Sequence, residues 1–219
     1  MKIHITFALA LLALPVLAGV ELPQATTSLI SPTADGITGM GSSQAINDRY
    51  ILLGAPDFDH TSAQNVGAVY VFSATTRKLI RRIQSPVLVA DERFGQTVAL
   101  FGTTADVGAG GNDTLANNGG AVYAFDIASG RKLWSNQGSQ ANAGMGTAAL
   151  AANQDYVLVG IPKGNASGKP TNSGLVRWIT RRTGLNVADS VGTSPSANDA
   201  YGTALACSGS TVAIGTPYA

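Results

Sequence analysis

The sequence predicts an all-β protein, specifically a β-propeller built from four-stranded antiparallel blades. One observation behind this prediction is an aromatic residue or methionine followed by glycine, which recurs roughly every 50 residues: Met40-Gly41, Phe94-Gly95, Met145-Gly146 and Tyr201-Gly202. Another is a small turn after the apolar run that follows each motif: Gly54-Ala55-Pro56, Gly108-Ala109-Gly110, Gly160-Ile161-Pro162 and Gly215-Thr216-Pro217. Self-similarity at such a period, with strand-like content, is typical of propellers and arrays.

A third segment follows in three of the units. Residues 67–72 read GAVYVF, 120–125 read GAVYAF and 174–178 read GLVRW. In the first unit we expect strands over residues 41–47, 50–53, 68–72 and 78–83, joined in part by the turn formers at 47–49 and 75–77. Four strands with links of this kind make one antiparallel blade.

The central strands are apolar at every position rather than at alternate ones. Residues 50–53 read YILL and residues 156–159 read YVLV. A strand with one solvent-exposed face alternates, so both faces of these strands must be covered, as they are in blades that stack around an axis. The fourth strands, 78–83 and 131–135, carry Lys and Arg, which is typical of outer edges.

Composition limits the classes of partner. The 219 residues carry a net charge of +1, so no global field favours nucleic acid or an anionic membrane. Cys207 is the single cysteine, which excludes an intrachain disulfide. After the leader described next, no segment is long and apolar enough to predict a transmembrane span.

The N-terminus has the pattern of an export signal. Lys2 supplies a positive charge, residues 5–17 are apolar, and Val16 and Ala18 suit the −3 and −1 positions of a cleavage site. We therefore expect a signal peptide at residues 1–18 and a protein that is secreted, extracellular or periplasmic.

Residues 39–219 are then expected to form the repeats, in units near 40–93, 94–144, 145–200 and 201–219, which is about three and a half blades. Residues 19–38 are a candidate outer strand for the closing blade. An open propeller exposes an apolar blade face and unpaired strand edges. The expectation is that the chain is a fragment of a larger propeller or closes its ring by oligomerisation.

In this order, the three motifs resemble the FG-GAP repeat of integrin α-subunit propellers, in the short form found in exported microbial proteins. The resemblance covers residues 39–219 and implies an extracellular recognition or adhesion module, not an enzyme, that needs no cofactor. Two positions depart from the pattern, since Gly110 replaces the proline of one turn and Arg177 replaces a buried tyrosine. Many family members carry a calcium loop after the first strand, but here a connection such as 47–49 has too few oxygen ligands, so no metal is expected.

Few residues suggest chemistry at a site. Asp57, Asp59 and His60 could hold a metal ion, but no other unit repeats this trio, which favours a polar loop. Residues 108–113 (GAGGND) faintly resemble a phosphate or calcium loop, but they precede no helix, which favours a flexible loop. His60 is the only histidine after the leader, and we predict no catalytic residue. Asn112 and Asn165 lie in glycosylation acceptor patterns.

The long connections at residues 57–66, 109–119 and 163–173 all join a second strand to a third strand. They are therefore expected to gather on one rim of the propeller. Loops on a rigid scaffold are where binding residues concentrate, so these loops are the predicted contact for a protein or glycan partner.

A group of basic residues lies near the turns between third and fourth strands: Arg77, Lys78, Arg131, Lys132, Arg181 and Arg182. Aligning the units by their third strands is expected to superimpose the pair at 77–78 on the pair at 131–132. Two interpretations stay open for this group. The charges could protect the outer edges from pairing, or they could bind an acidic polysaccharide or another polyanion.

One segment favours a different propeller. Residues 119–134 (GGAVYAFDIASGRKLW) resemble the repeat of pyrroloquinoline-quinone enzymes and of outer-membrane assembly propellers. Such repeats place a tryptophan in most blades, whereas the same alignment of the units sets Trp134 against Ile80. A quinoprotein-like dehydrogenase or assembly scaffold is therefore the alternative function.

Overall fold

The computed structural model describes Leu29 and residues 39–219, and it consists of β-strands joined by turns and loops. The predicted signal peptide lies outside the described residues, as does the predicted strand at 19–38 apart from Leu29. Within the described part of the chain there is no helix long and apolar enough to cross a membrane.

The strands of the described residues form three four-stranded antiparallel sheets and one two-stranded sheet. The first sheet contains β1 (Ser43–Ile46), β2 (Tyr50–Ala55), β3 (Ala68–Ser73) and β4 (Leu79–Gln84). The second contains β5 (Phe94–Phe101), β6 (Thr104–Ala109), β7 (Ala121–Asp126) and β8 (Lys132–Gln137). The third contains β9 (Ala149–Ala152), β10 (Tyr156–Ile161), β11 (Leu175–Thr180) and β12 (Asn186–Ser190), and the last contains β13 (Ala204–Ser208) and β14 (Thr211–Gly215).

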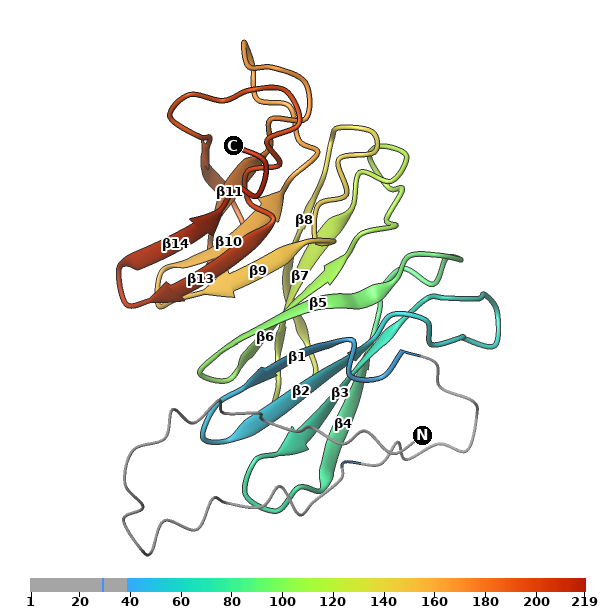
Figure 1. Cartoon of the computed structure of the whole chain (residues 1–219). Coiled ribbons are helices and arrows are strands. Elements are labelled where there is room, and N and C mark those ends of the chain that lie inside the picture. Colours follow the sequence, from blue (N-terminus) through green and yellow to red (C-terminus); the bar gives the residue numbers. More distant parts are fainter. Residues whose placement is uncertain (1–28, 30–38) are drawn as a thin grey trace, which may run out of the picture.

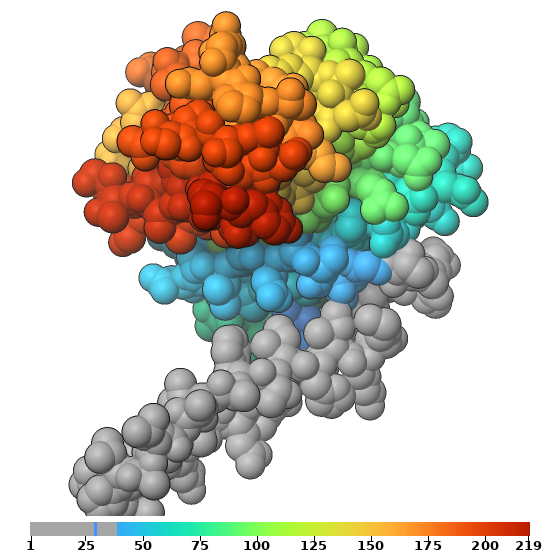
Figure 2. Space-filling view, turned by 45° about the horizontal axis from the view of Figure 1, so that its top comes forward, coloured from blue at the N-terminus to red at the C-terminus, as the bar shows by residue number. Residues whose placement is uncertain are grey.

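Each full sheet is one blade, with its strands in chain order from the inside to the outside. The blades are stacked side by side in sequence order, so that the colours run round the molecule from blue to red (Figures 1 and 2). The prediction of a β-propeller with four-stranded antiparallel blades is confirmed. The four predicted strands of the first unit are present, although the first is shorter than expected because Gly41 adopts a φ of 90° ahead of β1.

Apolar faces of neighbouring blades form the core, as the uninterrupted apolar strands predict. One cluster joins the first two blades and includes Leu52, Val71, Phe94, Phe125 and Ile127. A second cluster joins the second and third blades. The central strands β3 and β7 are almost wholly buried, whereas β4 and β12 are mostly exposed. The fourth strands are therefore the outer strands, as predicted.

Glycine backbones touch at every junction between the full blades and the blade that follows each of them. A Cβ atom on Gly54 would lie 2.0 Å from the carbonyl oxygen of Gly95 in the next blade. A Cβ atom on Gly108 would lie 2.3 Å from the carbonyl oxygen of Gly146, and one on Gly160 would lie 1.9 Å from that of Gly202. Beside each contact a short parallel bridge joins consecutive blades: Gly67 to Phe94, Gly120 to Met145 and Gly174 to Tyr201. The recurring glycines are thus required because two backbones pass there without room for a side chain.

The second and third blades are also joined by a buried ion pair. Arg181 follows β11 and donates from Nη1 to Oδ2 of Asp106 in β6 at 3.2 Å, and both side chains are almost fully buried. Its guanidinium also lies over the Phe101 ring, 4.8 Å from the centroid. Burial raises the pKa of Asp106 to about 7, although the positive charge of Arg181 acts in the opposite direction.

At the preceding junction the same two positions are apolar. Asp106 of the second blade is equivalent to Leu52 of the first, because Asp106 lies opposite Ala124 in its sheet and Leu52 lies opposite Val71. Arg181 of the third blade is equivalent to Ile127 of the second. The backbone N–H of Arg181 donates to the carbonyl of Asp155, and the backbone N–H of Ile127 donates to the carbonyl of Thr103 in the same way. Leu52 and Ile127 belong to one hydrophobic cluster. The Asp106–Arg181 pair therefore replaces a leucine–isoleucine pair, and the charge on each side has its partner on the other blade.

We expect Gly108→Ala to lower the free energy of unfolding by about 1–3 kcal/mol or more, because the new methyl group would meet the backbone of Gly146. Urea unfolding followed by circular dichroism measures this. The matched control is Gly192→Ala, whose Cβ would have its nearest neighbour, Tyr201 Cδ2, at 3.7 Å and should change little. Equal stability of the two variants would contradict the backbone-contact explanation.

The pairing of Asp106 with Arg181 in place of a leucine and an isoleucine is tested with Asp106→Leu, Arg181→Ile and the double variant. Each single change leaves one buried polar partner alone and should cost about 3–5 kcal/mol, whereas the double variant should be close to wild type. Unfolding free energies from a double-mutant cycle give the coupling. Additive single effects would show that the two side chains do not act as a pair.

Asp106 also predicts a dependence of stability on pH. Its pKa is about 7 in the folded protein against an ordinary value of 3.8, so the folded state holds a proton that the unfolded state has released. The stability that this bound proton contributes is fully present below pH 3.8, and it is lost as the pH rises through about 7. Wild type should therefore gain stability relative to Asp106→Asn as the pH falls through about 7. A gain as the pH rises would mean that Arg181 lowers this pKa.

Candidate functional site

The propeller arc has two rims that differ in loop length. The turns within β1–β2, β3–β4 and the equivalent hairpins lie at one end of the blades, which we call the hairpin rim. The loops 56–67, 110–120 and 162–174, together with the connections between blades, lie at the other end, which we call the long-loop rim (Figure 1). The three predicted binding loops thus share the long-loop rim.

A clamp of side-chain amides and carboxylates fixes the first loop of this rim. Asn65 has a φ of 51°, and its backbone N–H donates to Asp59 Oδ1 at 2.8 Å. The Asn65 side-chain amide donates to Asp91 Oδ1 at 2.7 Å, in the connection that leads to the second blade. The Asp59 carboxylate therefore binds the backbone of its own loop.

The same clamp occurs in the second and third blades. Asn118 and Asn172 also have positive φ, and their N–H groups donate to Asp113 and Asn165 at 2.6 and 2.7 Å. Their side-chain amides donate to Asn142 and Asn198 at 3.4 and 3.2 Å. This repeated clamp was not predicted from the sequence. The signal that could have revealed it is an asparagine two positions before the glycine that precedes each third strand.

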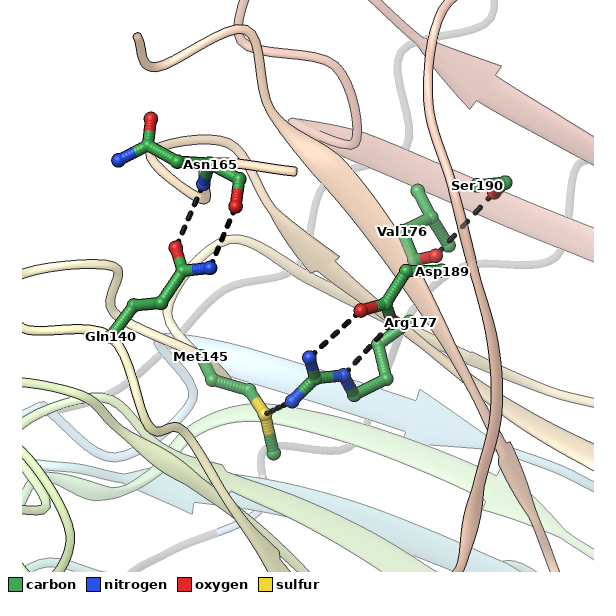
Figure 3. A network of polar contacts seen from close by, with 7 residues as sticks. All are labelled: Gln140, Met145, Asn165, Val176, Arg177, Asp189 and Ser190. Atoms are coloured by element: carbon green, nitrogen blue, oxygen red, sulfur yellow. Dashed lines mark hydrogen bonds and ion pairs between the residues drawn. The ribbon is translucent and has the colours of Figure 1, made fainter. Parts of the chain in front are cut away.

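Neighbouring loops of the rim are also bound to each other. Gln140, in the connection after the second blade, accepts from the backbone N–H of Asn165 at 2.8 Å and donates to its carbonyl at 2.7 Å. Figure 3 shows this two-point contact, with the Asn165 side chain pointing away from Gln140. The long loop of the third blade is therefore held to the connection that leads from the second blade to the third.

The trio Asp57, Asp59 and His60 does not converge on a common point. Asp57 faces Arg93 at 3.9 Å, and the His60 ring lies 2.8 Å from Ser62 Oγ. Within the described residues, no group of three or more His, Cys, Asp or Glu side chains could hold a metal ion. The three side chains thus have separate partners within and beside the loop.

A buried carboxylate lies beneath the rim, between the first and second blades. Glu92 is fully buried and accepts from Ser85 Oγ at 2.5 Å, Tyr123 Oη at 2.8 Å and Asn112 Nδ2 at 3.1 Å. Burial raises the pKa of Glu92, while these three hydrogen bonds act in the opposite direction. Because the Asn112 amide is enclosed in this network, it is not an accessible glycosylation acceptor, whereas Asn165 is exposed.

The buried position of Glu92 was not predicted from the sequence, although this residue closely precedes the Phe94-Gly95 motif. Its partner Tyr123 occupies a position that is Arg177 in the third blade, as predicted from the motif. Arg177 remains near the interior because Asp189 of the neighbouring outer strand binds it at two points, each 2.9 Å long (Figure 3). The tyrosine position thus tolerates a charge when the adjacent strand supplies its partner.

The hairpin rim carries the predicted basic residues, with one exception. Arg77, Lys78, Arg131, Lys132 and Arg182 are exposed. Arg181 does not belong to this exposed group, because it is buried against Asp106. Hydrogen bonds from Ser129, together with the charges of Arg131 and Arg81, lower the pKa of Asp126 on the second hairpin.

The predicted superposition of these hairpins is wrong by one position. In the pairing of third and fourth strands, Lys78 corresponds to Arg131, and Arg77 corresponds to Gly130. Trp134 likewise corresponds to Arg81, not to Ile80. The third strands begin at Ala68 and Ala121, 53 residues apart, whereas residues 77 and 131 are 54 apart. The spacing of 54 holds only before the long loops, as between Gly54 and Gly108, because the long loop of the second blade is one residue shorter.

Comparison with known proteins agrees with this architecture. A family model described as FG-GAP repeat matches residues 84–125. The structure of the computationally designed Ika8 protein matches with a TM-score of 0.52 and 19% identity, over 81% of this chain and 42% of that one. A europium-containing methanol dehydrogenase matches with a TM-score of 0.46 and 16% identity, over 71% of this chain and 26% of the dehydrogenase chain. This TM-score is too low to support an inference.

No curated protein sequence matches the chain. The similarity to Ika8 is a similarity of fold, and this chain spans less than half of that structure. The family match contains β5, β6 and most of β7, which together form the inner part of the second blade. Residues 84–125 therefore match the FG-GAP repeat, and the neighbouring four-stranded blades have the same topology.

Proposed function

We propose that this chain is an exported, non-enzymatic β-propeller module that recognises a protein or glycan partner through the long-loop rim. The observation that carries the proposal is the repeated clamp at Asn65, Asn118 and Asn172, which fixes both ends of each loop. Between the fixed ends the loops differ in length and sequence, reading HTSAQ, TLAN and ASGKPT at residues 60–64, 114–117 and 166–171. A scaffold that is constant at the loop ends and variable between them is suited to recognition.

The rigidity of the rim supports the same function energetically. A loop that is already held in place loses little conformational freedom when a partner binds, so more of the contact energy remains as affinity. Leu115 projects from the second loop with 62% of its surface exposed, although it is a large apolar side chain. An exposed apolar residue on a fixed loop is a suitable central contact for a partner surface.

The hairpin rim supports a second partner class, a polyanion. Arg77 has a φ of 58° at a position where the second and third blades have Gly130 and Gly184, each with a φ of 73°. Holding a non-glycine residue there costs about 1 kcal/mol. Edge protection does not require the charge at this strained position, so the placement of Arg77 favours binding of an acidic polysaccharide.

The recognition proposal is tested by replacing residues 114–117 with Gly and Ser at equal length, while Asp113 and Asn118 are kept. We expect an unchanged thermal unfolding curve, because the clamp preserves the fold, and loss of binding on an array of purified extracellular proteins. The matched control replaces Thr75 and Thr76 on the hairpin rim. Binding that survives in the loop variant but is lost in variants of the β4 face would overturn the rim proposal.

The non-enzymatic part of the proposal has its own measurement. Added pyrroloquinoline quinone should cause no absorbance change in the protein and no alcohol- or sugar-dependent dye reduction. Either signal at stoichiometric quinone would favour the quinoprotein alternative instead.

Polyanion binding is tested by neutralising Arg77, Lys78, Arg131 and Lys132 together, since all four are exposed on the hairpin rim. The variant should elute from an anionic polysaccharide matrix at clearly lower salt, because exposed charges are screened over about 8 Å at physiological ionic strength. The control is neutralisation of Lys163 and Lys169 on the opposite rim. An unchanged elution salt would leave edge protection as the role of these residues.

A further inference from the structure

The inner strands of the first three blades line an open groove of about 480 Å³. It is lined by residues 42–44 at the start of β1, residues 96–98 of β5 and residues 147–150 at the start of β9. Its volume lies within the range of small-molecule binding sites, about 300–1,000 Å³. The long loops of the rim and the basic hairpins contribute none of these residues, so the groove is distinct from both surfaces described above.

Three hydroxyl groups in the groove are fixed as hydrogen-bond acceptors. Ser43 Oγ donates its proton to the carbonyl of Gly95 at 2.7 Å, and Thr97 Oγ1 donates to that of Gly146 at 2.8 Å. Thr147 Oγ1 donates to the carbonyl of Gly144 at 2.7 Å. A hydroxyl has one proton and two lone pairs, so each of these oxygens has only acceptor capacity left. Thr97 is buried in the blade junction, whereas Ser43 and Thr147 are half-buried. The first two bonds also span the glycine contacts between blades, which holds them in place.

Two glutamine side chains supply complementary groups. Gln44 and Gln96 line the groove, and neither forms a side-chain hydrogen bond with another described residue. Each amide brings two N–H donors and one acceptor oxygen. The Oε1 atom of Gln96 is buried without a hydrogen-bond partner in the described part of the chain. An unsatisfied buried acceptor costs about 1–3 kcal/mol, which a rotation of the amide toward a donating occupant would recover.

The lining excludes several classes of ligand. None of the described residues around the groove carries a charge, so nothing there would compensate the desolvation of an anion or a cation. No aromatic ring among the described residues lines it, which leaves a flat heteroaromatic ligand without a stacking surface. Val98 and Leu150 add an apolar patch beside the polar groups.

We propose that this groove is a binding site for a neutral saccharide. Such a ligand donates its hydroxyl protons to Ser43 and Thr147 and accepts from the amides of Gln44 and Gln96. The C–H face of a pyranose ring packs on Val98 and Leu150. The site requires three consecutive blades, because each blade supplies one segment of the lining. This proposal is independent of recognition by the long-loop rim.

The test uses the full chain and neutral gluco-, manno- and galacto-oligosaccharides of one to four sugar units, read by saturation-transfer NMR. We expect at least one of them to bind, with an affinity that does not change with salt. Gln44→Ala/Gln96→Ala should weaken that binding by about tenfold or more, equivalent to about 1.4 kcal/mol. Ala148→Trp, which fills the groove at a half-buried position, should abolish it.

Two controls separate this site from the rim. The Thr75→Ala/Thr76→Ala variant and the Gly/Ser replacement of residues 114–117 should both keep full saccharide binding. Loss of binding in the loop variant, with the groove variants unaffected, would place the saccharide on the rim and overturn the groove proposal while supporting the proposed function. Absence of binding by every oligosaccharide at about 10 mM, far above ordinary dissociation constants, would also overturn it.

Discussion

The structure depends on the contact between glycine backbones at each blade junction. Gly54, Gly108 and Gly160 lie so close to the following blade that any Cβ would overlap a carbonyl oxygen. This contact sets how near adjacent blades can come, and it therefore determines which apolar side chains meet between them. It also places the carbonyl groups of Gly95 and Gly146 where Ser43 and Thr97 can bind them. Blade spacing, the hydrophobic core and the inner groove follow from the same constraint.

Two ion pairs among the described residues join neighbouring strands or neighbouring blades and are largely shielded from solvent. Arg181 reaches Asp106 across a junction, and Arg177 is held by Asp189 within its own sheet. Glu92 instead receives three neutral hydrogen-bond donors. A buried ion pair adds little net stability but strongly disfavours a wrong partner. We infer that Asp106 and Arg181 specify that the second blade adjoins the third, a role that the equivalent Leu52 and Ile127 cannot perform because apolar contacts are interchangeable.

Three surfaces of different chemistry are separated by the propeller geometry. The long-loop rim combines fixed loop ends with variable segments, the hairpin rim exposes positive charge, and the inner groove offers neutral hydroxyl and amide groups. Antiparallel strands carry alternate connections to opposite ends of each blade, so the two rims cannot mix. Change on one rim therefore leaves the other intact, which is the property that lets loop variants and hairpin variants be tested independently.

The sequence by itself determined the repeat, the blade and the inner and outer strands, because apolar runs, turn residues and glycine spacing are local signals. It also indicated that Arg177 replaces a buried tyrosine. Tertiary structure decided the rest. Arg181 and Asp106 are 75 residues apart and meet only when blades stack, so exposure of Arg181 could not be judged from its neighbours in sequence. The clamp at Asn65 depends on a partner 26 residues away, and the groove is assembled from three separate units. Such features arise from the spacing between blades, which no single repeat encodes.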